Sequence, residues 1–211
     1  MEPAADCGLC PRLAGWRPQN RVTLPEGHNA PVPAFGPLSA RLLIVGLAPG
    51  LRGANATGRP FTGDAAGDLL YPSLLTAGFA SGSYGRRPDD GLQLIDTRIT
   101  NAVRCVPPEN KPTTAEIATC SGFLTQEIAA MPRLRAVLAL GGIAHKAVLR
   151  ALGLKQSHCP FLHGETHTLP SGLALTDSYH CSRYNLNTGR LTAEMFAEVL
   201  AGLQSRLAAR P

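Results

Sequence analysis

The fold is constrained most strongly by an alternation between short aliphatic runs and segments with helical spacing. The run from Arg41 to Gly46 (RLLIVG) is aliphatic and ends in glycine, which is typical of a buried parallel strand. Three further strands are predicted within residues 97–103, 134–140 and 173–179, and helices within 64–79, 113–128, 142–154 and 193–209. This order predicts an α/β fold, a three-layer α/β/α domain with a small, mostly parallel central sheet and right-handed crossovers.

The length of the chain favours one domain over two. Its 211 residues, 44% of them hydrophobic, can bury a substantial core, so we expect a single domain over residues 1–211. Residues 11–40 contain six prolines and little apolar periodicity. Residues 1–40 are therefore expected to form a proline-rich N-terminal arm that runs extended over the core.

The charge balance permits a polyanionic partner without identifying one, because 20 basic and 15 acidic side chains leave a net charge of only +5. No stretch reaches the roughly 20 apolar residues that a membrane span needs. The N-terminus also lacks the charged start and apolar core of a signal peptide. We therefore expect a cytoplasmic protein that does not contact a membrane.

The cysteines indicate a metal site. Cys7 and Cys10 form a CxxC pair, and fourteen residues separate Cys105 from Cys120. In a reducing compartment four such thiolates suit zinc or an iron-sulfur cluster, and the spacing does not distinguish the two. The alternative is that these are ordinary buried thiols, which is also our interpretation of the two remaining cysteines, 159 and 181.

Ligands of parallel α/β sheets gather at the carboxyl ends of the strands. The loops after Gly46, Val103, Leu140 and Tyr179 are therefore the candidate site. Exposed cations in or near these loops, Arg52, Lys111, Arg183 and Arg190, are candidates for contacts to phosphates and are equally well explained as solvated surface charges.

Three segments in this order resemble the motifs of the type-B (family five) uracil-DNA glycosylases, the iron-sulfur branch of the uracil-DNA glycosylase superfamily. The first is Gly46-Leu47-Ala48-Pro49-Gly50 with Thr57-Gly58-Arg59-Pro60-Phe61-Thr62-Gly63-Asp64. The second is the strand Thr100-Asn101-Ala102-Val103-Arg104-Cys105. The third is Ser178-Tyr179-His180-Cys181-Ser182-Arg183-Tyr184-Asn185, followed by Asn187-Thr188-Gly189-Arg190.

The resemblance implies a monofunctional DNA glycosylase of base excision repair. Such an enzyme hydrolyses the N-glycosidic bond of uracil in DNA, and of other deaminated bases such as hypoxanthine, and leaves an abasic site. The resemblance also implies a monomer and a [4Fe-4S] cluster held by Cys7, Cys10, Cys105 and Cys120. That cluster would tie the N-terminal arm to the domain.

The resemblance also assigns roles to the site residues. Asp64 would stabilise the sugar cation and orient water, although an aspartate here is otherwise explained as the cap of a helix starting at Ala65. His180 would donate to the leaving base, and Asn101 carries a donor and an acceptor that match a uracil edge. The remaining substrate contacts would be the backbone amides of Leu47 and Ala48 and the ring of Phe61, for which simple core packing is the alternative.

The chain departs from the superfamily pattern at three positions. Cys181 stands where proline is common, and Ala48 lies in a loop that often carries an acidic or polar catalytic residue. Leu47 stands where the type-A iron-sulfur glycosylases, the nearest rival, normally have glutamate. Two further alternatives are a damaged-DNA-binding module with a structural metal and weak or no catalysis, and an electron-transfer protein.

Overall fold

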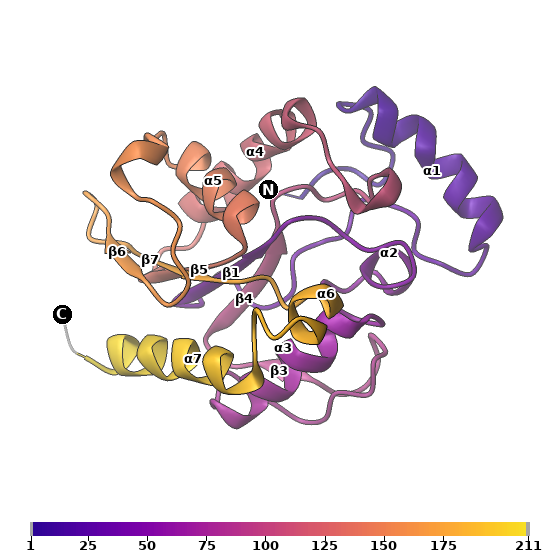
Figure 1. The fold of residues 1–211 in the computed structure, drawn as a ribbon. Helices are drawn as coiled ribbons and strands as arrows, with labels where there is room; N and C mark the ends of the chain where they lie inside the picture. The colour runs from indigo at the N-terminus through magenta and orange to yellow at the C-terminus, as the bar shows by residue number, and fades with distance from the viewer. Residues whose placement is uncertain (1, 210–211) are drawn as a thin grey trace.

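The computed structural model describes residues 2–209 as a sheet between two layers of helices (Figure 1). The five strands follow the order β4-β1-β5-β7-β6, and every neighbouring pair is parallel except β6 with β7. This confirms the predicted three-layer architecture and mostly parallel sheet. The ends of the predicted single domain, residues 1, 210 and 211, lie outside the described residues.

The strands of the main sheet are β1 (Leu42–Gly46), β4 (Thr97–Asn101), β5 (Ala136–Leu140), β6 (Thr166–Thr168) and β7 (Ala174–Ser178), and β2 (Ala80–Ser81) pairs separately with β3 (Gln93–Leu94). The helices are α1 (Pro11–Thr23), α2 (Ala54–Thr57), α3 (Ala65–Thr76), α4 (Thr114–Ala129), α5 (Gly142–Ala151), α6 (Arg183–Asn187) and α7 (Ala193–Ala208), with short 3-10 turns at Pro108–Asn110 and Gln156–His158. The predicted elements are confirmed to within a few residues.

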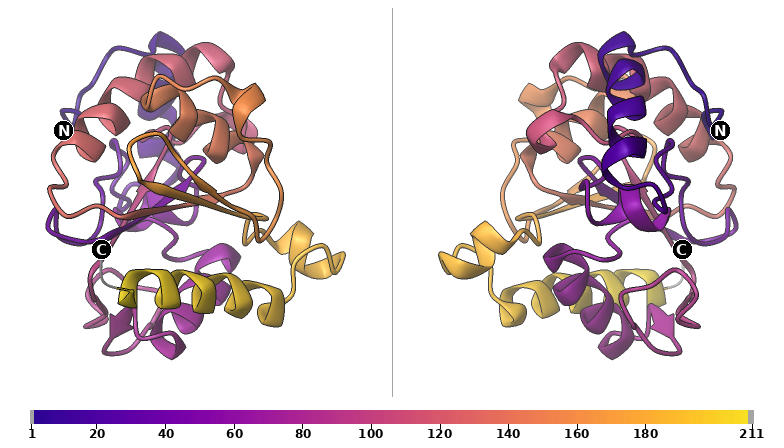
Figure 2. Two further views of the ribbon diagram at one scale, coloured as in Figure 1. Left: turned by 90° about the vertical axis from the view of Figure 1, so that its left-hand side faces the viewer. Right: turned by 90° about the vertical axis from the view of Figure 1, so that its right-hand side faces the viewer.

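The central strands β1 and β5 are buried on both faces, which explains why they are continuous aliphatic runs. In β1 the side chains alternate, so that Leu42 and Ile44 pack under α3 and α7 whereas Leu43 and Val45 pack under α4 and α5. The two helical layers lie on opposite sides of the sheet in both side views (Figure 2). Each layer therefore has its own hydrophobic core.

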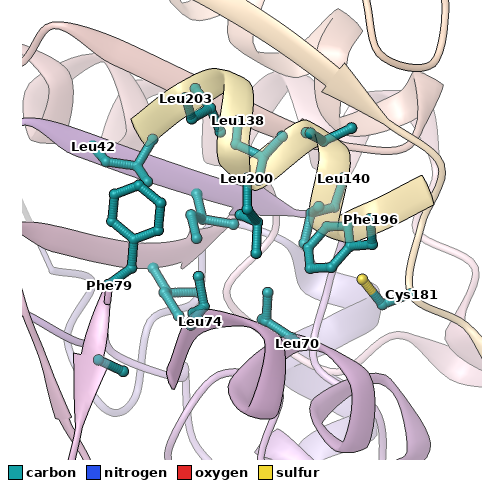
Figure 3. Close-up of a cluster of buried hydrophobic side chains, with 14 of the residues drawn as sticks. Leu42, Leu70, Leu74, Phe79, Leu138, Leu140, Cys181, Phe196, Leu200 and Leu203 are labelled. Atoms are coloured by element: carbon teal, nitrogen blue, oxygen red, sulfur yellow. The ribbon is translucent and has the colours of Figure 1, made fainter. Parts of the chain in front are cut away.

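The core between the sheet and the α3–α7 layer also explains how a cysteine is accommodated at position 181. Cys181 is fully buried beside Phe196 and Leu140 (Figure 3). Burial raises the pKa of its thiol to about 12. Cys181 is thus a small apolar core residue, in agreement with its interpretation as an ordinary thiol.

The prediction of an extended arm is wrong for residues 11–23, which form the helix α1. Pro11 occupies the first turn, where a missing N–H is tolerated, and Pro18 lies inside the helix. The helix persists because Leu13, Arg17 and Asn20 are buried on one of its faces, against the segment that carries Cys105. Residues 24–40 contain no helix and no strand of a sheet, only a bridge from Phe35 to Ile99.

Capping residues set the starts of α3 and α4, as the sequence indicates. Thr113 and Glu116 form the predicted capping box of α4, and Asp64 caps α3. Within residues 2–209, no helix has both the length and the apolar character of a membrane span.

Candidate active site at the carboxyl ends of the strands

Three predicted site residues, Phe61, Asn101 and His180, meet beside Gly46 at the carboxyl end of the sheet. We call these four residues the strand-end cluster. Gly46 pairs with Asn101 at the last position of β1 and β4. A Cβ added at Gly46 would overlap both the Phe61 ring and Oδ1 of Asn101, so only glycine permits this close approach. The centroids of the Phe61 and His180 rings lie 6.0 Å apart. The parallel register thus brings three distant motifs to one place.

The side chain of Asn101 offers a buried hydrogen-bond acceptor without a partner among the described residues. The side chain is 3% exposed, and the acceptor is its Oδ1. An unpaired buried acceptor is unfavourable, because the atom has lost water without gaining a donor. A ligand with an N–H at this position would supply the missing donor.

His180 is held as a neutral imidazole. Burial lowers the pKa of its side chain to about 4, so it carries no charge at pH 7. Its backbone carbonyl accepts a hydrogen bond of 2.8 Å from Nδ2 of Asn185, which fixes the loop after β7. A neutral imidazole can donate one N–H to an oxygen that gains negative charge.

The residue before His180 is held by a second set of contacts that the sequence did not indicate. The backbone N–H of Tyr179 donates to Nδ1 of His163 at 3.0 Å, and the two rings stack at 4.8 Å and 5°. The guanidinium of Arg190 lies 4.6 Å from the centroid of the Tyr179 ring. No sequence signal connects His163 to the motif, because His163 lies sixteen positions before Tyr179.

Asp64 stands at the N-terminus of α3 and faces the loop that follows β1. Its Oδ1 accepts from the backbone N–H of Ala66 at 3.1 Å, which is the expected capping bond. Its Oδ2 lies against Gly53, where a Cβ would overlap it, and near Gly50. Burial raises the pKa of this carboxyl, an effect that backbone N–H groups of the helix partly offset.

Leu47 and Ala48 connect the strand-end cluster to the cysteines. The Leu47 carbonyl accepts from the N–H of Val103 at 2.9 Å, which ties the two loops together. The side chain of Ala48 packs against Leu13, Val103 and Cys120 instead of joining the cluster. A small residue at position 48 thus has a packing role, and only its backbone remains available to a ligand.

All four predicted metal-binding cysteines line one cavity, together with apolar side chains of α1, α4 and the segment after β4. Burial raises the pKa of Cys10 and Cys105 and raises that of Cys120 to about 11. Among the described side chains, no group of three histidine, cysteine or acidic residues is arranged to hold a metal ion. The four thiols are nevertheless gathered around one space.

Arg17 is a buried cation at this cavity that the sequence did not indicate. Its Nη2 donates to the Cys7 carbonyl at 2.9 Å and lies 3.7 Å from Sγ of Cys105. A guanidinium here would stabilise negative charge on the sulfur atoms. The charge and the donor set of the cavity therefore both fit a group that is bound by thiolates.

Comparisons with known proteins place these features in a family. The model of the uracil DNA glycosylase superfamily matches residues 33–204. The chain is 49% identical to the type-5 uracil-DNA glycosylase of Thermus thermophilus, over 92% of this chain and 90% of that protein. It is 44% identical to the type-5 uracil-DNA glycosylase of Pyrobaculum aerophilum, over 92% and 86% of the two chains. A type-4 uracil-DNA glycosylase of the same organism is 37% identical over 58% of this chain and 55% of that protein.

Proposed function

This chain belongs to the uracil-DNA glycosylase superfamily, and from that membership we infer that it is a hydrolase that cleaves the N-glycosyl bond of uracil in DNA. The type-5 relatives are 49% and 44% identical over 92% of the chain, whereas type-4 relatives are 37% identical over 58% of it or 29% identical over 80% of it. The type-A rival is therefore the weaker assignment, in agreement with Leu47 standing where a glutamate would be expected.

The observation that carries the proposal is the strand-end cluster. It combines an aromatic ring, a buried amide oxygen without a donor and a neutral imidazole within one set of contacts. A base turned out of the duplex offers a flat face for stacking and polar edges for hydrogen bonds. Phe61 would stack on the base, and Asn101 would accept from its N3–H and donate to its O4.

Bond cleavage leaves positive charge on the sugar and negative charge on the base. The carboxylate of Asp64 stabilises the sugar cation and accepts a proton from the attacking water, whose oxygen bonds to C1′. The base departs with the electron pair of the broken bond and later takes a proton from solvent. His180 donates an N–H to the base oxygen that gains charge, and the amides of Leu47 and Ala48 donate to the same oxygen.

We extend the proposal to a [4Fe-4S] cluster on Cys7, Cys10, Cys105 and Cys120. Its support is the donor set: four thiols around one cavity, with the Arg17 guanidinium beside Cys105. When bound, such a cluster supplies a covalent tie between the N-terminal segment and the loop after β4 and takes no part in bond cleavage.

The proposal also covers the substrate range, the assembly and the compartment. We propose that the enzyme accepts other deaminated bases such as hypoxanthine, acts in the cytoplasm on DNA and works as a monomeric single domain. Exposed cations at the strand-end face, Arg52, Lys111, Arg183 and Arg190, would contact the flanking phosphates.

A panel of end-labelled oligonucleotides tests the function. Each carries one uracil, hypoxanthine, thymine or cytosine in single- or double-stranded form, and alkali converts abasic sites to strand breaks. We expect breaks at uracil and at hypoxanthine and none at thymine or cytosine. If iron-loaded protein followed by alkali gives no breaks in any of these oligonucleotides, the glycosylase proposal is refuted. Breaks at uracil alone would refute the wider substrate range.

A further inference from the structure

The motif segment 57–64 adopts a backbone conformation that its side chains disfavour. Phe61 has a φ of +53°, in the left-handed region that residues with a Cβ rarely occupy. Phe61 is also the residue whose ring contacts His180 in the strand-end cluster. Something outside the segment must therefore hold this backbone in place.

Arg59 and Asp90 provide such a hold. Nη1 and Nη2 of Arg59 donate to Oδ1 and Oδ2 of Asp90 at 2.8 and 2.7 Å, in a two-pronged pair. The two side chains are only 5% and 3% exposed. Nε of Arg59 donates to Oγ1 of Thr62 at 2.7 Å, so this side chain links the residues on the two sides of Phe61.

Backbone N–H groups near Asp90 also hold its carboxylate in place. Its Oδ2 accepts from the N–H of Gly85 at 2.8 Å, and its Oδ1 accepts from the N–H of Leu92 at 3.1 Å. The Arg59 guanidinium, with these N–H groups, holds the pKa of Asp90 well below the usual aspartate range. The carboxylate is therefore charged and immobile at neutral pH.

Two tyrosines complete the arrangement, with their rings beside the same guanidinium. The Arg59 guanidinium carbon lies 5.3 Å from the centroid of Tyr71 and 6.0 Å from that of Tyr84. The Tyr71 hydroxyl donates to the Pro60 carbonyl at 2.5 Å, and the Tyr84 hydroxyl donates to the Phe61 carbonyl at 3.4 Å. The peptide units on both sides of Phe61 are thus held by hydroxyl groups.

We propose that Arg59, Asp90 and Tyr84 are positioning residues for base excision, because they hold Phe61 against the strand-end cluster and Asp64 at the start of α3. The inference rests on the proposed glycosylase function. These residues touch no reacting atom, and they act through the conformation of residues 61–64. A purely structural ion pair would instead affect stability and leave the rate of the folded enzyme unchanged.

The variants Asp90→Asn and Tyr84→Phe test this role. Asp90→Asn keeps the shape of the side chain and removes its charge, and Tyr84→Phe removes one hydroxyl. The matched control is Asp96→Asn, which removes the ion-pair partner of Arg41 at the amino ends of β1 and β4, away from the strand-end cluster. Asparagine tolerates the positive φ of Asp96, which is 50°.

Three measurements are compared at a temperature where all variants are folded. They are the single-turnover rate of uracil release, the affinity for an oligonucleotide with a non-hydrolysable 2′-fluoro-deoxyuridine, and the hydrogen exchange of the peptide that spans residues 57–67. We expect Asp90→Asn to slow release by about 10- to 100-fold and Tyr84→Phe by a smaller factor. Affinity should change by less than about threefold while exchange of 57–67 increases, and Asp96→Asn should match the wild type in all three.

The inference is overturned if Asp90→Asn releases uracil within about twofold of the wild-type rate, or if exchange of 57–67 does not change. It is also overturned if Asp96→Asn slows release as much as Asp90→Asn does. Should Asp90→Asn fail to fold, Tyr84→Phe decides by the same criteria. Wild-type protein that releases no uracil would instead refute the proposed function, and the exchange measurement would still decide whether Arg59, Asp90 and Tyr84 hold residues 57–67.

Discussion

At the scale of single residues, Asp64 combines two roles that are usually separated. One carboxylate oxygen caps α3, and the other faces the glycine loop after β1. Burial raises the pKa of the Asp64 carboxyl, and helix capping alone does not require this shift. A carboxylate that is partly removed from water and faces a loop is suited to stabilise the positive charge of the sugar. Substitution can separate the two roles, because asparagine caps helices about as well as aspartate.

The variant Asp64→Asn should therefore lose activity and keep stability. We expect its single-turnover rate of uracil release to fall by about 100-fold or more. Its free energy of unfolding should change by less than about 0.5 kcal/mol, because the cap is retained. Asp68→Asn is the control, since Asp68 lies in the same helical turn but is half-exposed and paired with Arg86. Similar rates for the two variants would remove Asp64 from the chemistry.

The pH dependence of the rate follows from two opposite pKa shifts. Asp64 acts as a carboxylate and burial raises its pKa, so the rate should rise with pH through a value above the ordinary aspartate pKa of about 3.9. His180 has a pKa of about 4 and stays neutral above it. The rate should then show no histidine step near pH 6.5, where a free imidazole titrates. A decline in rate through about pH 6.5 to 7 that His180→Gln abolishes would show that His180 acts as a cation.

At the scale of elements, α3 meets the motif segment at Gly67. A Cβ at this position would overlap the Phe61 carbonyl oxygen and approach the Tyr84 hydroxyl. We expect Gly67→Ala to slow uracil release by at least about tenfold and to destabilise the fold by about 1–3 kcal/mol. Both effects are measured by single-turnover kinetics and denaturant unfolding.

Gly122→Ala is the matched control for that substitution. Gly122 is an exposed glycine inside α4, and nothing lies within 4 Å of a Cβ there. Alanine should raise stability by about 0.5–1 kcal/mol through its better helix propensity and leave the rate unchanged. If Gly67→Ala behaves like Gly122→Ala, the close approach of α3 to Phe61 does not matter for catalysis.

The elements also show what sequence patterns can and cannot predict. Patterns of apolar residues located β1, β4, β5 and β7, which are largely buried between the helical layers, and the capping box located α4. They did not indicate the short strands β2, β3 and β6, which are only partly buried. They also missed α1, because two prolines argued against a helix whose stability comes from burial of Leu13 and Arg17. Tertiary packing of this kind leaves no local signal.

The same limit applies to the site. Strand ends and motifs predicted Phe61, Asn101 and His180, and the parallel register brings them together. Asp90 and Arg59 are 31 residues apart and share no motif, so their pairing could not be predicted from the sequence. Roles in the chemistry depend on side-chain contacts, and contacts across such separations are fixed only by the fold.

At the scale of the whole molecule, the cysteine cavity and the strand-end cluster use the same two loops. β1 ends at Gly46 in the cluster, and the loop that follows packs Ala48 beside Cys120. β4 ends at Asn101 in the cluster, and the segment that follows carries Cys105 four residues later. A change at the cavity should therefore reach the cluster through the bond from Val103 to the Leu47 carbonyl.

Substitution of one cysteine tests this coupling. Cys105→Ala should lose the proposed cluster. Hydrogen exchange should then increase in α1 before it increases in β1 and β5. The reason is that α1 packs against the cysteine cavity, whereas β1 and β5 are buried between two hydrophobic cores. Loosening of residues 101–105 should also slow uracil release. Cys159→Ala is the control, since that thiol is buried beneath α5 and away from the cavity. Full iron content in Cys105→Ala, or exchange of α1 equal to that of the control, would contradict both the ligand assignment and the coupling.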